Sequence, residues 1–490
     1  MSPTPATARA PILRPRISEV AAEIAKNAKI LEDYIMSQGL PYPSFAADGP
    51  SAFPLPPPST PENEKLHGAR YQLLSTSKLM YDLIAGPSEL NQWNALNFND
   101  TACLQVIYNF KIAQFVPETG DISFEDLGSK INIPATKLGQ VLRYAMTNHI
   151  FYEPRDGYVA HTASSLLLRD ENLPASAWVG VCVDEFFHAS TNATKALKNF
   201  PHHEDIEKSA FSISPMFNGK GYFKYLSTDP ELSRRFGLSM SQWSSGVGLK
   251  AESLIKGYNW GKLPKGATIV DVGGATGFVC VEVAKAYPHL KFHIQDLSVP
   301  SLEAGQRNLA RDNPELVGNF EYQEHDFFTQ QPVNGAEVYF FRFILHDWPD
   351  KYVLQILKNI VPALKNGSKI VVSDFILPPP NSLHPWEERR ARYVIYLRYW
   401  VFFLSRPSTR MVIDSQLTTL CIILNAGQPT LSCSSCLTHA NDERRTGEGY
   451  SLKWIQSLDL TAFKRWMVRY WESSSAPMLT SRRHRPYLIY

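Results

Sequence analysis

The stretch ATIVDVGGATGFVCVEVAK, residues 267–285, points most directly to the architecture of this chain. It begins with a short β-branched run that ends at Asp271, passes through a glycine-rich turn and continues as a predicted helix from Phe278 to Ala286. A strand, a glycine turn and a helix in this order form the first unit of a parallel α/β sheet. The glycines let the backbone approach a ligand closely at the carboxyl end of the strand.

Alternating strands and helices continue after this unit. Residues 291–296 are predicted as a second strand that ends in Asp296, 19 residues after Gly277. A doubly wound sheet places a carboxylate here on ribose hydroxyls, although an acid at this point also serves as a helix cap or turn residue. Three further strands are predicted over 322–328, 336–342 and 368–374, with a helix over 353–364. This alternation predicts a parallel sheet with helices on both faces.

The glycine turn favours a nucleoside ligand without a pyrophosphate. It runs Gly-Gly-Ala-Thr-Gly from Gly273 to Gly277, whereas dinucleotide sites use G-x-G-x-x-G. The chain also lacks the G-x-x-x-x-G-K-[ST] phosphate loop. Nucleotides bound through a phosphate cradle are therefore excluded.

Composition narrows the function classes further. The chain has 490 residues, of which 44% are hydrophobic and 20% are charged, and its formal net charge is +2. This balance predicts a globular protein and gives no bulk attraction to nucleic acid or an anionic membrane. The sequence shows neither a signal peptide nor an apolar stretch long enough to span a bilayer, so we expect a cytoplasmic protein.

The cysteines form no disulfide framework. The chain has six, and Cys433 and Cys436 make a lone C-x-x-C pair. Zinc or redox use of that pair is the alternative to an accidental spacing, but no second pair accompanies it. We therefore predict no metal site.

The first half of the chain is predicted to be mainly helical. One helix is expected over 16–39, and a proline-rich linker separates it from a second over 64–84. Within 100–170, a short helix starting at Asp121, a second helix and a hairpin of 150–152 with 157–159 suggest a winged helix.

This winged-helix module carries two open readings, DNA binding or packing and dimerisation. Its second helix, residues 135–146, holds only Lys137 and Arg143 as basic residues, which favours dimerisation. The following region, residues 174–258, is helical and rich in aromatic side chains. Those rings form either a core or a cap suited to a flat, apolar ligand.

Four motifs carry a resemblance to a known family. They are Asp271-Val-Gly-Gly-Ala-Thr-Gly277, Gln295-Asp296-Leu297, His325-Asp326-Phe-Phe and Arg342-Phe-Ile-Leu-His346-Asp-Trp. With them, residues 64–390 resemble the plant and fungal small-molecule O-methyltransferases that use S-adenosylmethionine, especially the fungal set that acts on aromatic polyketides. The resemblance implies a Rossmann-like methyltransferase domain with a parallel sheet, preceded by a mainly α winged-helix dimerisation domain.

The resemblance also implies a site. The cofactor S-adenosylmethionine would be held by Asp271, Gly273, Gly274, Gly277, Asp296, Leu297, Asp326, Phe327 and Arg342. His346 would be the general base for a phenolic acceptor, because a phenol with a pKa near 10 is a poor nucleophile at neutral pH. Asp374 and Glu443 would be the two acids that orient this imidazole. The family implies a homodimer in which each winged helix closes the partner's substrate pocket.

The family pattern stops after Arg390. We expect an N-terminal helix and linker over 1–62, a winged-helix domain over 63–172, a helical pocket region over 173–258, a catalytic domain over 259–392 and an aberrant tail over 393–490. We hypothesise that a retained intron between Arg392 and Gly427, together with a frameshift, produces this tail. If the tail is native as written, the sheet is expected to lack its closing strands.

Two kinds of rival function stay open. The chain could be a family member repurposed to another reaction or to the methylation of N or C. It could also be a non-enzyme, either a catalytically impaired partner subunit or a winged-helix regulator, but His346, Asp374 and the intact glycine turn argue against this second kind.

Overall fold

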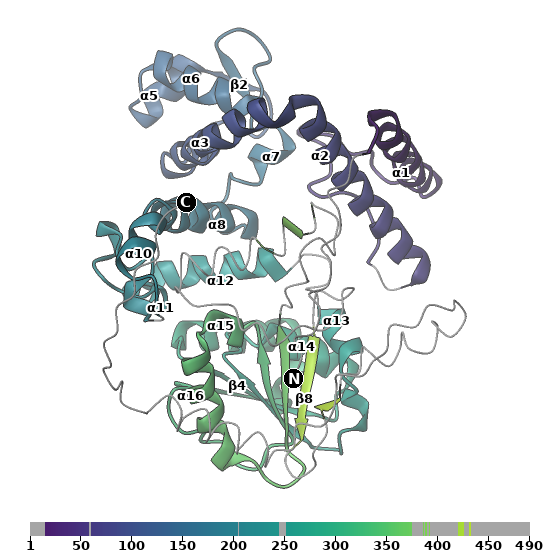
Figure 1. The fold of residues 1–490 in the computed structure, drawn as a ribbon, viewed down its shortest axis with the longest axis vertical. Helices are drawn as coiled ribbons and strands as arrows, with labels where there is room; N and C mark the ends of the chain where they lie inside the picture. Colours follow the sequence, from purple (N-terminus) through teal and green to yellow (C-terminus); the bar gives the residue numbers. More distant parts are fainter. Residues whose placement is uncertain are drawn as a thin grey trace, which may run out of the picture.

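The computed structural model describes residues 15–57, 60–203, 205–244, 251–374, 420–425 and 431–432, and the single residues 386, 388, 389 and 392. Figure 1 shows a helical N-terminal module at one end, a middle layer of helices and an α/β sheet at the other end. The site discussed below lies where the middle layer meets the sheet.

Five parallel strands form the centre of the sheet, as the sequence predicted. They are β3 Thr268–Val272, β4 Lys291–Asp296, β5 Phe320–Glu324, β6 Val338–Arg342 and β7 Lys369–Asp374, in the spatial order β5-β4-β3-β6-β7. In this order β3 has β4 on one side and β6 on the other, so the direction in which successive strands are added reverses beside β3. Ligands of open parallel sheets bind at the carboxyl ends of the strands beside such a switch point.

The expectation that the sheet lacks its closing strands is wrong for the chain as written. Strand β8, Leu420–Asn425, pairs antiparallel with β7 from Lys369↔Asn425 to Asp374↔Leu420, and β9, Leu431–Ser432, pairs with β8. The apolar run Leu-Cys-Ile-Ile-Leu supplies a strand to an edge whose backbone N–H and C=O groups would otherwise be unpaired.

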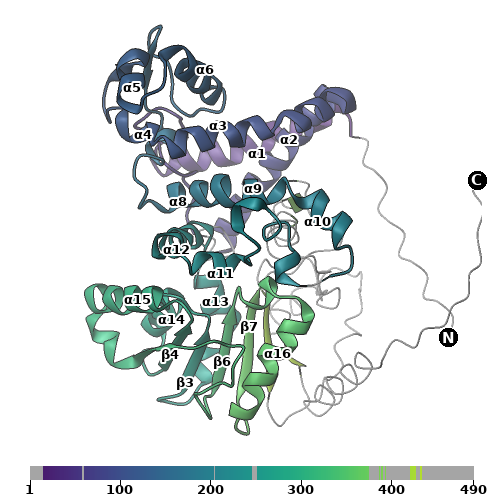
Figure 2. The same cartoon turned by 90° about the vertical axis from the view of Figure 1, so that its left-hand side faces the viewer.

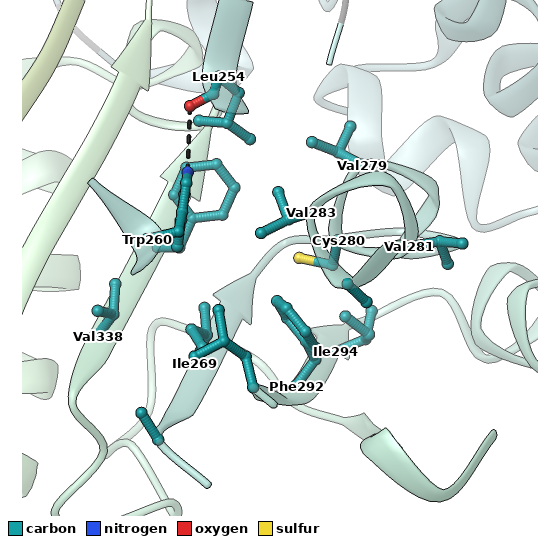
Figure 3. Close-up of a cluster of buried hydrophobic side chains, with 14 of the residues drawn as sticks. Leu254, Trp260, Ile269, Val279, Cys280, Val281, Val283, Phe292, Ile294 and Val338 are labelled. Carbon is teal, nitrogen blue, oxygen red and sulfur yellow. Dashed lines mark hydrogen bonds between the residues drawn. The ribbon is translucent and has the colours of Figure 1, made fainter. Parts of the chain in front are cut away.

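Helices cover both faces of the sheet (Figure 2). One face packs against α13 Ala251–Gly257, α14 Phe278–Ala286 and α15 Val299–Asp312, and the other packs against α16 Asp350–Ile360. Figure 3 shows the first of these cores, in which the Trp260 indole donates a hydrogen bond to the Leu254 carbonyl at 3.1 Å. Along β3, Ile269 enters this core while Val270 and Val272 enter the other, which is the strand period of two.

The N-terminal module is helical. It contains α1 Ile17–Ser37, α2 Pro61–Leu96, α3 Phe98–Asn109, α4 Ile112–Phe115, β1 Asp121–Ser123, α5 Phe124–Ile131, α6 Ala135–Met146, β2 Tyr158–Ala160 and α7 Ala163–Leu166. Helix α2 is kinked at Gly86, whose φ of 69° breaks the helix before Pro87.

The winged-helix module differs from its prediction in one pairing. Asp121–Ser123 is a strand rather than the start of a helix, and it pairs with β2. The predicted hairpin is reduced to a single bridge, in which Tyr152 and Ala160 exchange both backbone hydrogen bonds, at 3.1 and 3.0 Å, on the edge of β2 away from β1. Arg143 of α6 forms ion pairs with Glu153 at 2.6 Å and Asp156 at 3.0 Å, so its charge is matched locally.

The middle layer follows the predicted helical region. It contains α8 Pro174–Val181, the π-helix η1 Cys182–Phe186, α9 Phe187–Ser190, α10 Ala193–Asn199, α11 Tyr222–Leu226 and α12 Pro230–Ser244.

Short 3₁₀ turns are η2 Ile206–Lys208, η3 Pro215–Phe217, η4 Trp260–Lys262, η5 Pro314–Asn319, η6 Leu345–Asp347 and η7 Val361–Ala363. Within the described part of the chain, we find no helix with the length and apolar content that a membrane crossing requires.

Candidate active site

The glycine turn after β3 is closed tightly. The amides of Gly273 and Gly274 both donate to the Gln295 carbonyl, at 2.8 and 2.9 Å, so the turn is tied to β4. Gly273 and Gly277 have backbone φ values of 78° and 70°, which residues other than glycine rarely adopt. A Cβ at Gly274 would lie 2.5 Å from the Asp271 carboxylate. These positions therefore require glycine for conformation and for space.

Asp271 is buried against this turn. Its Oδ2 accepts a hydrogen bond from the Cys280 thiol at 3.2 Å. Burial raises the pKa of Asp271 to about 6, against the lowering effects of the Cys280 hydrogen bond and the Arg342 charge. Asp271 thus lies against the glycine turn and bonds to the first part of α14.

Asp296 lies at the carboxyl end of β4. Its Oδ2 accepts from the Ala275 amide at 2.9 Å, and its Oδ1 accepts from the Ser298 amide at 2.8 Å. Burial raises the pKa of Asp296, while these backbone hydrogen bonds favour the carboxylate. Next to it, Leu297 is 63% exposed. An oriented carboxylate beside an uncovered apolar side chain suits a ribose attached to a flat base.

Asp326 and Phe327 follow β5. The Asp326 carboxylate accepts from the Phe328 amide at 2.9 Å, which fixes the loop. The Phe327 ring packs edge-on against Trp348, with centroids 5.7 Å apart, and lies within contact range of the Gly273 position. The structure therefore brings this loop to the glycine turn.

Arg342, the last residue of β6, lies between two aromatic rings. Its guanidinium carbon is 5.7 Å from the Phe278 ring centroid and 4.5 Å from that of Phe343. Burial lowers the pKa of Arg342 to about 10, although the Asp271 charge acts in the other direction. The side chain therefore stays cationic at neutral pH and faces the acidic side of the glycine turn.

His346 stands between two carboxylates. Its Nδ1 is 2.5 Å from Asp374 Oδ1, and its Nε2 is 3.2 Å from Asp347 Oδ1. Its backbone amide also donates to the second Asp374 oxygen at 2.9 Å. The Phe343 ring, on a residue with a strained φ of 55°, stacks at 5.7 Å from the imidazole. These contacts fix the imidazole in position and orientation.

Two opposing effects act on the pKa of His346. Burial lowers it, but the charges of Asp374 and Asp347 outweigh burial and raise it to about 9. We expected an imidazole that titrates near neutrality. The physical reason for the difference is the pair of carboxylates: the charge of Asp374 raises the pKa most, and that of Asp347 adds to it. Asp347 was not predicted as a partner, and its only sequence signal is its position beside His346.

One predicted site residue cannot be placed. Glu443 lies outside the described residues, as do Cys433 and Cys436. Sequence reasoning also missed the buried amide pair of Gln295 and Gln331, which exchange hydrogen bonds at 2.9 and 2.8 Å and anchor the Asp326 loop. Among the residues that the structure describes, no group of His, Cys, Asp or Glu is arranged to hold a metal ion.

The strand ends fit S-adenosylmethionine. A nucleoside needs an acid for its ribose and apolar walls for its base, and Asp296, Leu297 and Phe327 provide them. Phe278 is 46% exposed at the start of α14, which leaves further apolar surface at the same edge. The cofactor would supply an electrophilic methyl group here, and the residues around His346 would face the methyl acceptor.

Comparisons with known proteins agree with this site. Residues 203–394 match the model of the O-methyltransferase domain family. A chlorophenol O-methyltransferase of Trichoderma longibrachiatum is 34% identical over 77% of this chain and 79% of its own length. The O-methyltransferase gsfB of Penicillium aethiopicum is 35% identical over 77% of this chain and 86% of its own. Among solved structures, OxaC shares the fold with a TM-score of 0.64 and 17% identity, over 84% of this chain and 98% of its own.

Proposed function

Because the chain belongs to the S-adenosylmethionine-dependent O-methyltransferases, we propose that it methylates a phenolic hydroxyl of an aromatic, polyketide-type secondary metabolite, with His346 as general base. One observation carries this proposal. His346 is held between Asp374 and Asp347 at the strand ends that also present Asp296 and the glycine turn. The names of the two fungal relatives support an O-methyl transfer, and that of the Trichoderma relative supports a phenolic acceptor.

His346 would manage the acceptor proton. Asp374 contacts Nδ1 and thereby leaves Nε2 directed to the side of Asp347. A phenol that binds there gives up its proton to the imidazole as its oxygen attacks the methyl group. The two acids keep the imidazole of the free enzyme protonated at neutral pH. A phenolate bound beside this imidazolium carries the same number of protons as a phenol bound beside a neutral imidazole, so both describe the same bound state. Either way, the site holds a nucleophilic oxygen next to a fixed proton carrier.

The acceptor would lie against an aromatic wall, which we define as Phe223, Phe327, Phe328, Trp348 and Tyr352. Trp348 is central to it, stacked on Phe223 at 5.7 Å and edge-on to Phe328 at 4.6 Å. Flat aromatic molecules gain both apolar burial and ring–ring contacts on such a surface. An aromatic acceptor is therefore favoured over an aliphatic one.

The partner is proposed to be a second copy of the chain. Helix α2 and the start of α3 expose Tyr81, Ile84, Trp93, Leu96 and Phe98, and Ile84 is 69% exposed. A series of large apolar side chains on a helical face marks an interaction surface. We place the enzyme in the cytoplasm as part of the same proposal.

The test compares His346→Ala with wild type on a panel of phenols, with product identified by mass spectrometry. We expect wild type to methylate at least one phenol and His346→Ala to lose roughly 100-fold or more of that rate. Binding of S-adenosylhomocysteine, measured by calorimetry, should survive in the variant.

His293→Ala is the matched control, because His293 lies in the middle of β4, paired with the exposed Glu321 at 3.3 Å. It should keep full activity. Retained turnover in His346→Ala would refute the general-base role. A folded wild type that binds the cofactor product but methylates no phenol would favour the partner-subunit alternative.

A further inference from the structure

A buried ionic cluster lies in the middle layer, outside the site described above. Arg235 of α12 donates hydrogen bonds to Asp184 at 2.9 Å and to Glu185 at 2.7 Å, and the Glu185 side chain has no exposed surface. The Tyr222 hydroxyl donates to the other Glu185 oxygen at 2.6 Å. The cluster thus joins α12, η1 and the first residue of α11.

The two acids sit in a π-helical turn. In η1, the Phe187 amide bonds to the Cys182 carbonyl five residues earlier, which widens the helix between α8 and α9. Consecutive residues Asp184 and Glu185 both reach Arg235 from this turn. Such π-turns recur at functional sites, where they re-aim side chains.

The N-terminal module is tied to the same turn. The Asn109 amide of α3 donates to Asp184 at 2.8 Å, and the Gln105 amide donates to the Val183 carbonyl at 2.8 Å. The cluster therefore has a fixed anchor on the side away from the sheet.

On the other side, the cluster leads to the aromatic wall. Phe223 directly follows Tyr222, and its ring stacks on Trp348 with an interplanar angle of 19°. Trp348 in turn follows Asp347, which contacts the His346 imidazole. Any movement of α11 is thus transmitted to one face of the proposed acceptor site.

We propose that Tyr222 is a positioning residue for the acceptor: its hydroxyl ties α11 to Glu185 and thereby holds the Phe223–Trp348 stack in place. This inference rests on the proposed function for its kinetic consequence only. A hydrogen bond to a buried carboxylate is among the stronger ones in proteins, and it is directional. This bond lies in the middle layer, between α11 and η1, whereas the proposed cofactor site lies at the glycine turn and the end of β4.

Tyr222→Phe tests the proposal, because it removes the hydroxyl and keeps the ring. We expect the KM for a methylated phenol from the panel above to rise by roughly fivefold to tenfold. The dissociation constant of S-adenosylhomocysteine should stay as in wild type. Hydrogen–deuterium exchange should become faster both in 222–226 and in 343–348, the segment that contains His346 and Trp348.

Tyr339→Phe is the matched control. The Tyr339 hydroxyl is also buried and donates to the Val333 and Ala363 carbonyls at 2.8 and 2.9 Å, near the amino ends of β6 and β7, whereas Trp348 follows the carboxyl end of β6. This variant should lower the unfolding temperature without faster exchange in 222–226 or a higher acceptor KM.

Two results would overturn the inference. Exchange confined to 222–226, with an unchanged acceptor KM, would show that α11 moves without consequence for the wall. If Tyr222→Phe also weakened S-adenosylhomocysteine binding, the Tyr222 hydroxyl would have a general structural role rather than a role in positioning the acceptor. If wild type methylates no phenol, the proposed function fails, and exchange in 343–348 still decides whether Tyr222 positions the wall.

Discussion

Asp347 changes the chemistry expected of His346. The imidazole has one carboxylate at each ring nitrogen, Asp374 at Nδ1 and Asp347 at Nε2. They raise the pKa of His346 to about 9 despite burial. The free enzyme at pH 7 therefore carries an imidazolium, which attracts a phenolate and must lose its proton before it acts as a base.

The raised pKa of His346 predicts that kcat/KM increases with pH. We expect kcat/KM for a weakly acidic phenol to increase through about pH 9, since the unprotonated imidazole is the form that accepts the proton. Asp347→Asn removes one of the charges that raise the pKa, so the rising limb should move to lower pH by roughly one unit. Initial rates across pH 6–10 would check this. A limb that stays in place would show that Asp347 does not act on the imidazole.

Gly274 is required for space beside Asp271. A methyl group there would lie 2.5 Å from the Asp271 carboxylate, and overpacking of this kind costs about 1–3 kcal/mol. We expect Gly274→Ala to weaken S-adenosylhomocysteine binding by roughly tenfold or more. Gly318→Ala, at a position with open space, is the control and should bind as wild type. Normal calorimetric affinity in Gly274→Ala would contradict the tight turn.

At the scale of elements, α2 exposes more large apolar side chains than any other described helix. Its exposed aromatic and aliphatic side chains cluster after the kink at Gly86 and just before it, on Tyr81, Ile84 and Trp93. Burying such side chains removes apolar area from water, at about 25 cal/mol per Å². The kink therefore shapes a surface that a second copy can cover.

Ile84→Asp tests this surface. A buried, unpaired charge at an interface is costly, so we expect the variant to shift from dimer to monomer in light scattering coupled to size exclusion. Val317→Asp, an equally apolar exposed position in η5, should leave the mass unchanged. A dimer that survives Ile84→Asp would place the interface elsewhere.

Across the whole molecule, the sequence predicted individual strands and helices better than it predicted the pairing of segments that lie far apart in the chain. The β-branched run, the glycine turn and the alternation of strands and helices predicted all five parallel strands, although the third ends at Glu324 rather than at residue 328. They also predicted that Asp296, Arg342 and Asp374 end neighbouring strands of one sheet. The β1–β2 pairing and the β7–β8 pairing could not be predicted, because each joins segments more than thirty residues apart. The second partner of His346 was missed for another reason: its effect depends on burial, which a motif does not report.

The tail is the largest open feature at this scale. The family match ends at residue 394, close to the predicted boundary at 393. The retained-intron hypothesis remains a prediction. Strand β8, however, lies within the segment hypothesised as intron, and its removal would uncover β7. We predict a transcript that lacks the codons between Arg392 and Gly427, with a replacement strand encoded downstream. Sequencing the message across this region checks it, and an uninterrupted message would end the hypothesis.

The central claim is that His346 removes the proton of a phenolic acceptor. The most direct measurement compares kcat/KM of wild type and His346→Ala across phenols of graded acidity at one pH. We predict that the loss caused by His346→Ala shrinks steadily as the phenol becomes more acidic, because an ionised phenol needs no base. The same loss for every phenol would contradict the account, since it would assign His346 to structure rather than to proton transfer.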